Sequence, residues 1–136
     1  MKIEPYLFFN GSCEDAINFY KQALGAEVVM LMRNKENPEP QYAQGLPPGS
    51  SEKVMHAHLR IGDANMMMSD GMCSGKANFQ GVTLSLGVAD AAQAEQCFAA
   101  LTPGGTVNMP LGKTFYASSF GMVTDRFGVS WMVIAP

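Results

Sequence analysis

The amino-acid sequence predicts an α+β fold built from two modules that each have the element order βαβββ. Three observations support this prediction. Apolar periodicity gives the order strand, helix, strand, strand, strand twice along the chain. Each helical segment carries its own start and stop signals. Residues 54–70 alternate with period two on both sides of Gly62-Asp63, which indicates a β-hairpin. We expect module 1 at about residues 1–70 and module 2 at about 79–136, within one domain of 136 residues.

Module 1 opens with an apolar segment, Ile3 to Phe9, that is typical of a strand. The following residues predict a helix at about 13–24, with Ser12 as its N-cap and Gly25 at its C-terminal end. A second strand is expected from Ala26 to Arg33. The hairpin then supplies the two remaining strands of the module.

The polar segment from Asn34 to Lys53 separates the second strand from the hairpin and contains four prolines: Pro38, Pro40, Pro47 and Pro48. At about 20 residues it is longer than most connections in compact domains. We therefore expect it to act as a lid over a pocket or to reach toward a partner subunit.

The hairpin register places Arg60 opposite Asn65, His58 opposite Met67 and His56 opposite Ser69. Alternation then separates two faces. The apolar face, which we expect in the core, carries Ala57, Leu59, Ile61, Ala64, Met66 and Met68. The polar face carries His56, His58, Arg60, Asn65, Met67 and Ser69. Two histidines and an arginine on one sheet face make it the candidate site.

Module 2 repeats the element order after a small, polar link from Gly71 to Gln80. A strand is expected from Val82 to Val88, followed by a helix at about 91–101 that begins with a capping box of Asp90 and Gln93. Pro103-Gly-Gly105 ends that helix. Further strands are expected around Val107, at 118–124 and at 129–134, with a turn at 125–128 between the last two.

Charge and composition exclude several classes of function. The net charge is −3, and nine Lys and Arg residues are dispersed along the chain, so we expect no nucleic-acid partner. No apolar run approaches the roughly 20 residues of a membrane span. Cys13, Cys73 and Cys97 form neither a zinc signature nor a disulfide framework, which favours the cytoplasm. Cys73, near Lys76, has the most plausible setting for a reactive thiol, although an incidental surface thiol is favoured.

Several sequence blocks carry a resemblance to a known superfamily. They are residues 5–10 (PYLFFN), 13–17 (CEDAI), 17–25 (INFYKQALG), 69–70 (SD), 74–76 (SGK) and 123–132 (VTDRFGVSWM). With the duplicated element order, they resemble the vicinal oxygen chelate superfamily of glyoxalases, bleomycin-resistance proteins and extradiol dioxygenases, and within it the PhnB-like branch. The resemblance implies that each module curls a mixed four-stranded sheet around a concave cavity, commonly in a homodimer.

The resemblance also implies four metal-ligand positions on strands that line the cavity. In this chain they fall on Pro5, Met67, Gly81 and Met132, none of which binds a hard or borderline divalent ion well. A shift of one residue would add Glu4 and Gln80, which do not complete a set. We therefore expect no inherited metal and no cofactor, and no lyase, dioxygenase or thiol-transferase chemistry based on that metal.

An alternative keeps a divalent metal at displaced ligands. His56 and His58, two residues apart on one strand, share a face and could chelate such an ion. The acids near them in this arrangement are Asp70 and Glu4, and turn capping is the default role of Asp70. Neutral imidazoles that hydrogen-bond within a polar cavity are the favoured interpretation.

Strand parity extends the candidate pocket into module 2. Thr83 and Ser85 are expected on its inner wall, as are Ser130 and Met132, whereas Val82, Leu84, Val129, Trp131 and Val133 are expected to face the helices. The predicted ligand-binding residues are therefore His56, His58, Arg60, Asn65, Met67, Ser69, Thr83, Ser85 and Met132.

Two classes of function follow. The first is a PhnB-like protein that binds a small, partly apolar or anionic molecule without the inherited metal. The second is a metal-dependent lyase, transferase or dioxygenase that uses His56 and His58, so whether the protein is an enzyme stays open.

Sequences of this branch have been described as resembling demethylubiquinone methyltransferase. The chain has no glycine-rich strand-to-helix loop and no doubly wound βα alternation, which argues against that activity.

Overall fold

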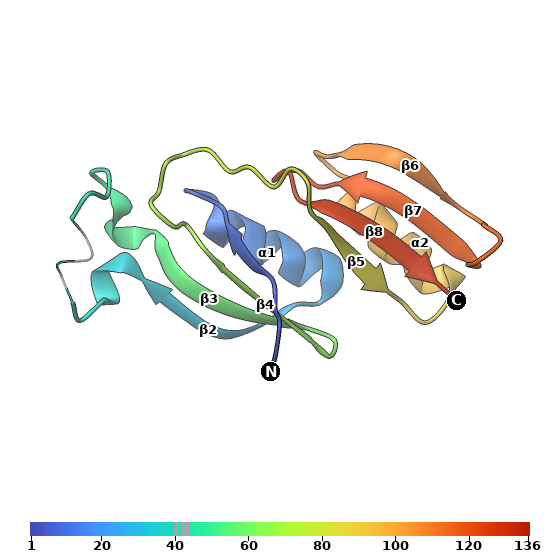
Figure 1. The fold of residues 1–136 in the computed structure, drawn as a ribbon, viewed down its shortest axis with the longest axis horizontal. Coiled ribbons are helices and arrows are strands. Elements are labelled where there is room, and N and C mark those ends of the chain that lie inside the picture. The colour runs from blue at the N-terminus through green and yellow to red at the C-terminus, as the bar shows by residue number, and fades with distance from the viewer. Residues whose placement is uncertain (40, 42–43) are drawn as a thin grey trace. The chain divides into compact units, whose positions relative to one another are not determined.

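The computed structural model describes residues 1–39, 41 and 44–136, which form two compact units, Met1–Asn78 and Phe79–Pro136 (Figure 1). Both units have the predicted order βαβββ. The first contains β1 (Tyr6–Phe8), α1 (Cys13–Leu24), β2 (Glu27–Arg33), β3 (Val54–Ile61) and β4 (Ala64–Ser69). The second contains β5 (Thr83–Gly87), α2 (Ala91–Leu101), β6 (Thr106–Gly112), β7 (Ser119–Thr124) and β8 (Ser130–Ala135). Both helices are therefore confirmed.

The two sheets have the same topology. The strand order is β1-β4-β3-β2 in the first four-stranded sheet and β5-β8-β7-β6 in the second. One pair in each sheet, β1–β4 and β5–β8, is parallel, and the other pairs are antiparallel. The α+β class with mixed sheets is therefore confirmed. Pro110 lies in β6, an outermost strand, where a residue without an N–H is tolerated.

The core of the first unit forms between α1 and one face of its sheet. Alternate hairpin residues are almost completely buried there, as the period-two pattern predicts: Ala57, Leu59, Met66 and Met68. The buried side of α1 consists of Cys13, Ala16, Ile17 and Tyr20. Ile61 is only half-buried and Ala64 is exposed, because both flank the turn at Gly62, whose φ of 57° suits a primed turn.

The core of the second unit forms in the same way between α2 and its sheet. Trp131 is 3 % exposed, and its Nε1 donates a hydrogen bond to Asp125 Oδ2 at 2.9 Å, so its predicted core position is confirmed. Val129 and Val133 are also buried. Val82 is 61 % exposed because β5 begins only at Thr83, so its predicted inward orientation is wrong.

The two helices begin differently from each other. Asp90 accepts a hydrogen bond from Gln93 N at 2.8 Å, as predicted, while Gln93 Oε1 accepts from Ala89 N rather than from the N-cap amide. Ser12 occupies the N-cap position of α1, but its hydroxyl donates back to Phe9 O. Ser12 is therefore the N-cap residue, as predicted, but its side chain makes no capping hydrogen bond, and the first amide of the helix, that of Cys13, donates to Asp70 Oδ1.

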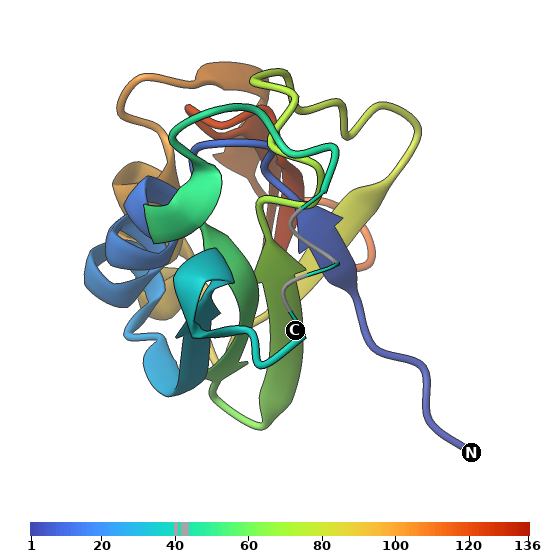
Figure 2. The same cartoon turned by 90° about the vertical axis from the view of Figure 1, so that its left-hand side faces the viewer.

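Two further segments differ from the prediction. The first strand covers Tyr6–Phe8 instead of beginning at Ile3, because Pro5 has no N–H for the ladder and contributes only its carbonyl, which accepts from Met67 N. The segment from Asn34 to Lys53 includes 3₁₀ turns at Asn34–Glu36 and Ser50–Glu52, which lie beside each other where β2 ends and β3 begins (Figure 2).

Residues 40, 42 and 43 of that segment lie outside the described residues. The role of the segment from Asn34 to Lys53 as a lid or partner contact stays a prediction. Within the described part of the chain, no helix is long and apolar enough to span a membrane.

Candidate functional site

The hairpin separates its two faces as predicted. Arg60 is the Cα partner of Asn65 and His58 is the partner of Met67, so the predicted register is confirmed at both pairs. We call the face opposite the α1-packed core the histidine face. On β3 and β4 it contains His56, His58, Arg60, Asn65, Met67 and Ser69. Ser69 is only 2 % exposed, and its hydroxyl accepts a hydrogen bond from Gly71 N. This hydroxyl therefore stabilises the turn that follows β4.

The neighbouring strands add residues to the histidine face that sequence reasoning missed. Tyr6 is the parallel partner of Met67, and Phe8 is the partner of Ser69. Both rings are exposed, at 38 % and 52 %, while Leu7 between them is buried. Alternation around Leu7 could have indicated this orientation. The pairing of β1 with β4 joins segments about 60 residues apart, so the sequence of β1 alone does not predict it.

Tyr6 and His56 form a hydrogen-bonded pair on this face. The Tyr6 hydroxyl lies 2.8 Å from His56 Nδ1, and the ring centroids are 5.5 Å apart. Phe8 continues the aromatic surface, with its centroid 5.0 Å from that of Tyr6. The contact with Tyr6 restrains the His56 imidazole.

His58 is positioned by Asn65 on the adjoining strand. The distance between His58 Nε2 and Asn65 Oδ1 is 2.7 Å. An amide oxygen can only accept, so Nε2 carries the hydrogen and donates it. In a neutral ring, Nδ1 is then left with a lone pair that can accept a hydrogen bond, take up a proton or bind a metal ion. Arg60 is exposed next along the face, with Glu27 as its Cα partner on β2.

The predicted residues of the second unit lie together on one face of its own sheet. Thr83 Oγ1 donates to Ser130 Oγ at 3.0 Å, and Ser85 is the Cα partner of Met132. On β8, Ser130 and Met132 alternate with the core residues Trp131 and Val133. That they complete one pocket with the histidine face stays a prediction.

The alternative metal site at His56 and His58 has fewer carboxylates available as ligands than the sequence indicates. The Asp70 carboxylate is 1 % exposed and accepts hydrogen bonds from three backbone amides, those of Gly11, Cys13 and Val54, at 2.7–2.9 Å. Glu4 lies 3.4 Å from Lys2 Nζ. Among the described residues, no three His, Cys, Asp or Glu side chains gather in a group that could hold a metal ion. Whether the protein binds a divalent ion stays a prediction.

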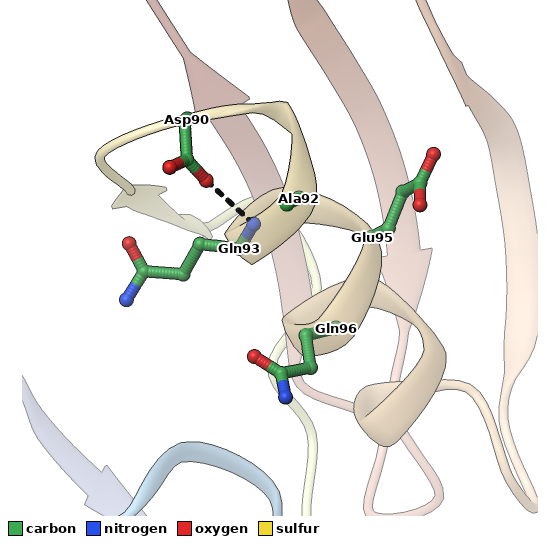
Figure 3. Close-up of a pocket in the computed structure, with 5 residues that line it drawn as sticks. All are labelled: Asp90, Ala92, Gln93, Glu95 and Gln96. Atoms are coloured by element: carbon green, nitrogen blue, oxygen red, sulfur yellow. Dashed lines mark hydrogen bonds between the residues drawn. The ribbon is translucent and has the colours of Figure 1, made fainter.

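Among the described residues, two of the surface depressions each lie within one unit, and neither of these two includes a residue of the histidine face. One runs along the exposed side of α2 and is lined by Asp90, Ala92, Gln93, Glu95 and Gln96 (Figure 3). The other adjoins the start of α1 and is lined by Gly11, Glu14, Asp15, Glu52, Lys53, Val54 and Asp70.

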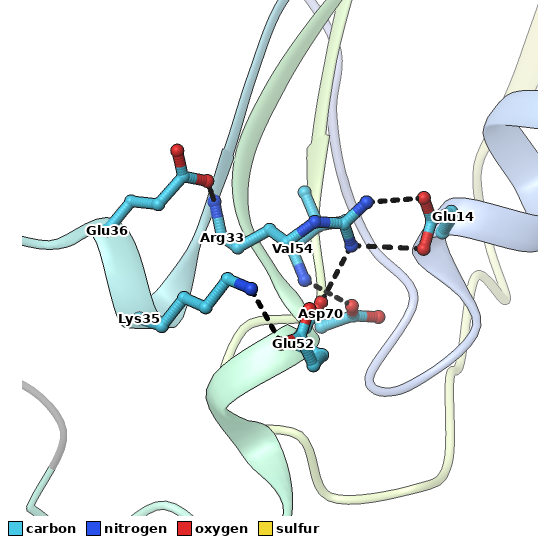
Figure 4. Close-up of polar contacts among 7 residues, drawn as sticks. All are labelled: Glu14, Arg33, Lys35, Glu36, Glu52, Val54 and Asp70. Atoms are coloured by element: carbon cyan, nitrogen blue, oxygen red, sulfur yellow. Dashed lines mark hydrogen bonds and ion pairs between the residues drawn. The ribbon is translucent and has the colours of Figure 1, made fainter.

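An ion-pair network surrounds the second depression (Figure 4). The Arg33 guanidinium binds both carboxylate oxygens of Glu14, at 3.0 and 2.6 Å, and its hydrogen bonds hold the pKa of Glu14 below the ordinary value. Lys35 Nζ lies 2.7 Å from Glu52 and lowers the pKa of that carboxylate. All four side chains are paired and solvent-accessible, which favours a structural role for them.

Two of the three cysteines, Cys13 and Cys97, are poorly suited to act as nucleophiles. Burial raises the pKa of Cys13, helped by the nearby Asp70 charge, and burial also raises the pKa of Cys97. Both shifts favour the unreactive thiol. Cys73 is half-buried, and its sulfur lies 3.8 Å from Asn34 Nδ2.

Comparison with known proteins supplies the family. A family described as 3-demethylubiquinone-9 3-methyltransferase matches residues 1–134. Protein YjdN of Escherichia coli is 39 % identical over 98 % of this chain and 94 % of its own length. The crystal structure of PA1353 from Pseudomonas aeruginosa is 43 % identical, with a TM-score of 0.85 over 99 % of this chain and 97 % of that one.

Two other solved structures extend the likeness. The PhnB protein of Bacillus cereus is 27 % identical, with a TM-score of 0.81 over the whole of both chains. A glyoxalase/bleomycin resistance protein from Albidiferax ferrireducens shares the fold alone, at 17 % identity and a TM-score of 0.57 over 90 % of this chain and 88 % of that one. The chain therefore belongs to the PhnB-like family that is described as 3-demethylubiquinone-9 3-methyltransferase, and it has the glyoxalase/bleomycin-resistance fold.

Proposed function

We propose that this PhnB-like protein binds a small organic molecule on the histidine face, without the inherited divalent metal. The observation that supports this proposal most directly is the row of His56, His58 and Arg60 on alternate positions of β3. Two of the three side chains are already positioned, by Tyr6 and by Asn65. Positioned polar groups beside apolar surface are typical of small-molecule sites.

The chemistry of the face favours a ligand with an anionic or carbonyl oxygen and a partly apolar body. Arg60 offers several N–H donors in a fixed plane, which suits carboxylate and phosphate groups. Tyr6, Phe8 and Met67 offer aromatic and thioether surface. We include Asn65 from β4 in the site.

An enzyme is the second candidate. The hydrogen bond from His58 to Asn65 leaves Nδ1 able to act as a base or as a metal ligand, together with His56 on the same face. The family description names a methyltransferase, but each sheet here has one parallel pair instead of the doubly wound parallel order typical of nucleotide-cofactor enzymes. We therefore favour binding over methyl transfer.

A ligand screen with paired variants tests the proposal. Native mass spectrometry with a library of small carboxylates, phosphates and ketones identifies binders. Arg60→Ala and His58→Ala should each weaken binding by about 1–3 kcal/mol, because a charge-assisted or positioned hydrogen bond is lost. Lys113→Ala, which removes one exposed positive charge from the second unit, is the matched control.

Two results would contradict the proposal. Ligands whose affinity is the same in the wild type, Arg60→Ala and His58→Ala would bind elsewhere. Elemental analysis that finds one tightly held divalent ion per chain, lost in the His56→Ala/His58→Ala double variant, would favour the metalloenzyme.

We also propose a homodimer, because each sheet ends in an edge strand with exposed apolar side chains. Val28 and Val29 on β2 and Met109 on β6 are each at least 40 % exposed. Light scattering at micromolar concentration should give twice the mass of 14.6 kDa, and a monomer at that concentration would refute this part of the proposal.

A further inference from the structure

We propose that the histidine face also holds one soft monovalent metal ion, Cu(I), between Met30, His58 and Met67. This inference is independent of the organic-ligand proposal. It rests on the register of three strands and on the hydrogen bond that positions one imidazole. The ligand set comprises two thioethers and one neutral ring nitrogen.

The strand register brings the three side chains to one place. His58 on β3 is the Cα partner of Met30 on β2 and also of Met67 on β4. Side chains of directly paired residues leave the sheet on the same face, with Cβ atoms about 4.5–5.5 Å apart. One imidazole is therefore flanked by a methionine on each side, and the flexible methionine side chain lets both sulfurs approach a shared ion.

A register shift in β2 is responsible for one of these ligands. The pairing moves by one residue between Val28 and Met30. With regular pairing, Val29 would lie opposite His58, and Met30 would lie opposite Ala57 on the core side. The shift instead turns Met30 to the histidine face, and also Met32, the Cα partner of His56. Such irregularities commonly redirect a side chain near a functional site.

The second observation concerns the imidazole itself. His58 donates its Nε2–H to Asn65 Oδ1 at 2.7 Å, which leaves the Nδ1 lone pair for an ion. Histidines that bind metals usually donate their other ring N–H to an oxygen in this way, and the partner fixes both tautomer and orientation. Asn65 therefore acts as a positioning residue for His58.

The donor set selects the metal. Thioethers are soft ligands that favour Cu(I), whereas Mg²⁺, Ca²⁺ and Mn²⁺ require oxygen ligands and Zn²⁺ prefers thiolate, imidazole and carboxylate. The ligand set is neutral, which suits an ion of charge +1 better than a divalent ion. Met30 is 42 % exposed, and His58 and Met67 are half-buried, so an ion can reach the site from solvent.

A competition titration tests the inference. Metal-free protein is titrated with Cu(I) under anaerobic conditions against the chromogenic chelator bicinchoninate. We expect one Cu(I) per chain to be retained, and Met30→Leu, Met67→Leu and His58→Gln each to weaken its affinity by about tenfold or more. Asn65→Ala should also lower the affinity, on the order of tenfold, because His58 loses its positioning partner. Met→Leu nearly conserves side-chain volume, and circular dichroism checks the fold of each variant.

Two controls separate this site from adventitious binding. Met72→Leu changes a 61 % exposed methionine outside the strands and should leave the Cu(I) affinity unchanged. Cys73→Ser tests whether a thiol is the true ligand. The ¹³C-methyl resonances of Met30 and Met67 should shift on addition of Ag(I), a redox-inert surrogate, while that of Met72 should not.

Three outcomes would overturn the inference. They are loss of Cu(I) to the chelator from the wild type, binding that persists in Met30→Leu/Met67→Leu but disappears in Cys73→Ser, and Ag(I)-induced shifts that spare both methionines. Organic ligands are screened with metal-free protein, so either proposal can fail while the other holds.

Discussion

The two units of this protein share one topology but present different chemistry on the open faces of their sheets. In the first unit that face carries two imidazoles, a guanidinium and two exposed aromatic rings. In the second it carries hydroxyls and thioethers, with Thr83 bonded to Ser130 and Ser85 opposite Met132. Buried alternate residues specify the repeated architecture, whereas the open faces are free to differ. Function is therefore expected to be divided unequally between two similar scaffolds.

The units also differ in how their helices begin. The first amide of α1 is bonded by Asp70, which is 57 residues away in sequence and buried. Asp90, immediately before α2, bonds an amide of its own helix and is exposed. One helix thus depends on long-range packing for its capping, and the other depends on its local sequence.

The largest expected effect is that of Asp70→Ala, which should destabilise the protein by about 3–5 kcal/mol because three backbone amides lose their acceptor in a buried site. Asp90→Ala should cost only about 1 kcal/mol, the usual value for an exposed N-cap. Urea unfolding followed by far-ultraviolet circular dichroism measures both.

Ser12→Ala is the control for this comparison, because the Ser12 hydroxyl bonds to Phe9 O instead of capping α1, and it should change stability by less than about 0.5 kcal/mol. A cost for Ser12→Ala as large as that for Asp90→Ala would show that Ser12 caps α1 after all. Trp131 fluorescence reports separately on the second unit, since it is the single tryptophan.

A smaller effect is expected where the chain enters the strand after each helix. Ala26 precedes β2, and Gly105 precedes β6. A Cβ on Gly105 would collide with the Thr124 carbonyl oxygen, so Gly105→Ala should cost about 1–3 kcal/mol through overpacking. The reverse change, Ala26→Gly, should cost about 1 kcal/mol through backbone entropy and a lost methyl group.

Gly112→Ala on β6 is the matched control, because a Cβ there meets no atom within 4 Å. Thermal unfolding should rank the three variants with Gly105→Ala the least stable. If Gly105→Ala and Gly112→Ala melted together, the close approach between the start of β6 and Thr124 would be disproved.

The smallest effect concerns the pairing of Glu14 with Arg33 in the first unit (Figure 4). Because Arg33 lowers the pKa of folded Glu14, the pair stabilises the protein above the ordinary pKa of 4.5, and this contribution is lost as the pH falls below that value. The Glu14 side chain is 51 % exposed, so Glu14→Gln should cost no more than about 0.5–1 kcal/mol at pH 7.

The stability difference between wild type and Glu14→Gln should therefore shrink when urea unfolding is repeated at pH 3. Salt at 1 M, which screens exposed pairs, should also reduce it at pH 7. Glu95→Gln on the exposed side of α2 supplies the same substitution in the other unit (Figure 3). A difference that grows toward pH 3 would contradict the assigned sign.

Local pattern predicted most of the fold. Both helices, the element order and the hairpin pairs of His58 with Met67 and Arg60 with Asn65 follow from periodicity and turn chemistry, and the structure confirms them. The burial of Trp131 follows from its apolar alternate neighbours. Each of these helices, hairpin pairs and buried positions is specified by residues that lie close to it in the sequence.

The features that sequence reasoning missed depend on contacts between distant segments. Tyr6 joins the histidine face only because β1 pairs with β4. Asp70 accepts from the first amide of α1 because the end of β4 meets the loop before that helix. Met30 faces His58 because the register shifts by one residue in β2, whereas unbroken alternation would place it in the core.

The three hydrogen bonds of Asp70 also have a consequence for the order of folding. The bonds from Gly11 and Cys13 close loops of 59 and 57 residues, so they cannot form until the chain has returned from β4 to the start of the unit, whereas the bond from Val54 spans only the 16 residues of the hairpin. Contacts that close long loops form slowly, because chain entropy is lost before the contact stabilises the structure. During synthesis, the first amide of α1 therefore lacks this acceptor until residue 70 has left the ribosome, long after the helix itself has emerged.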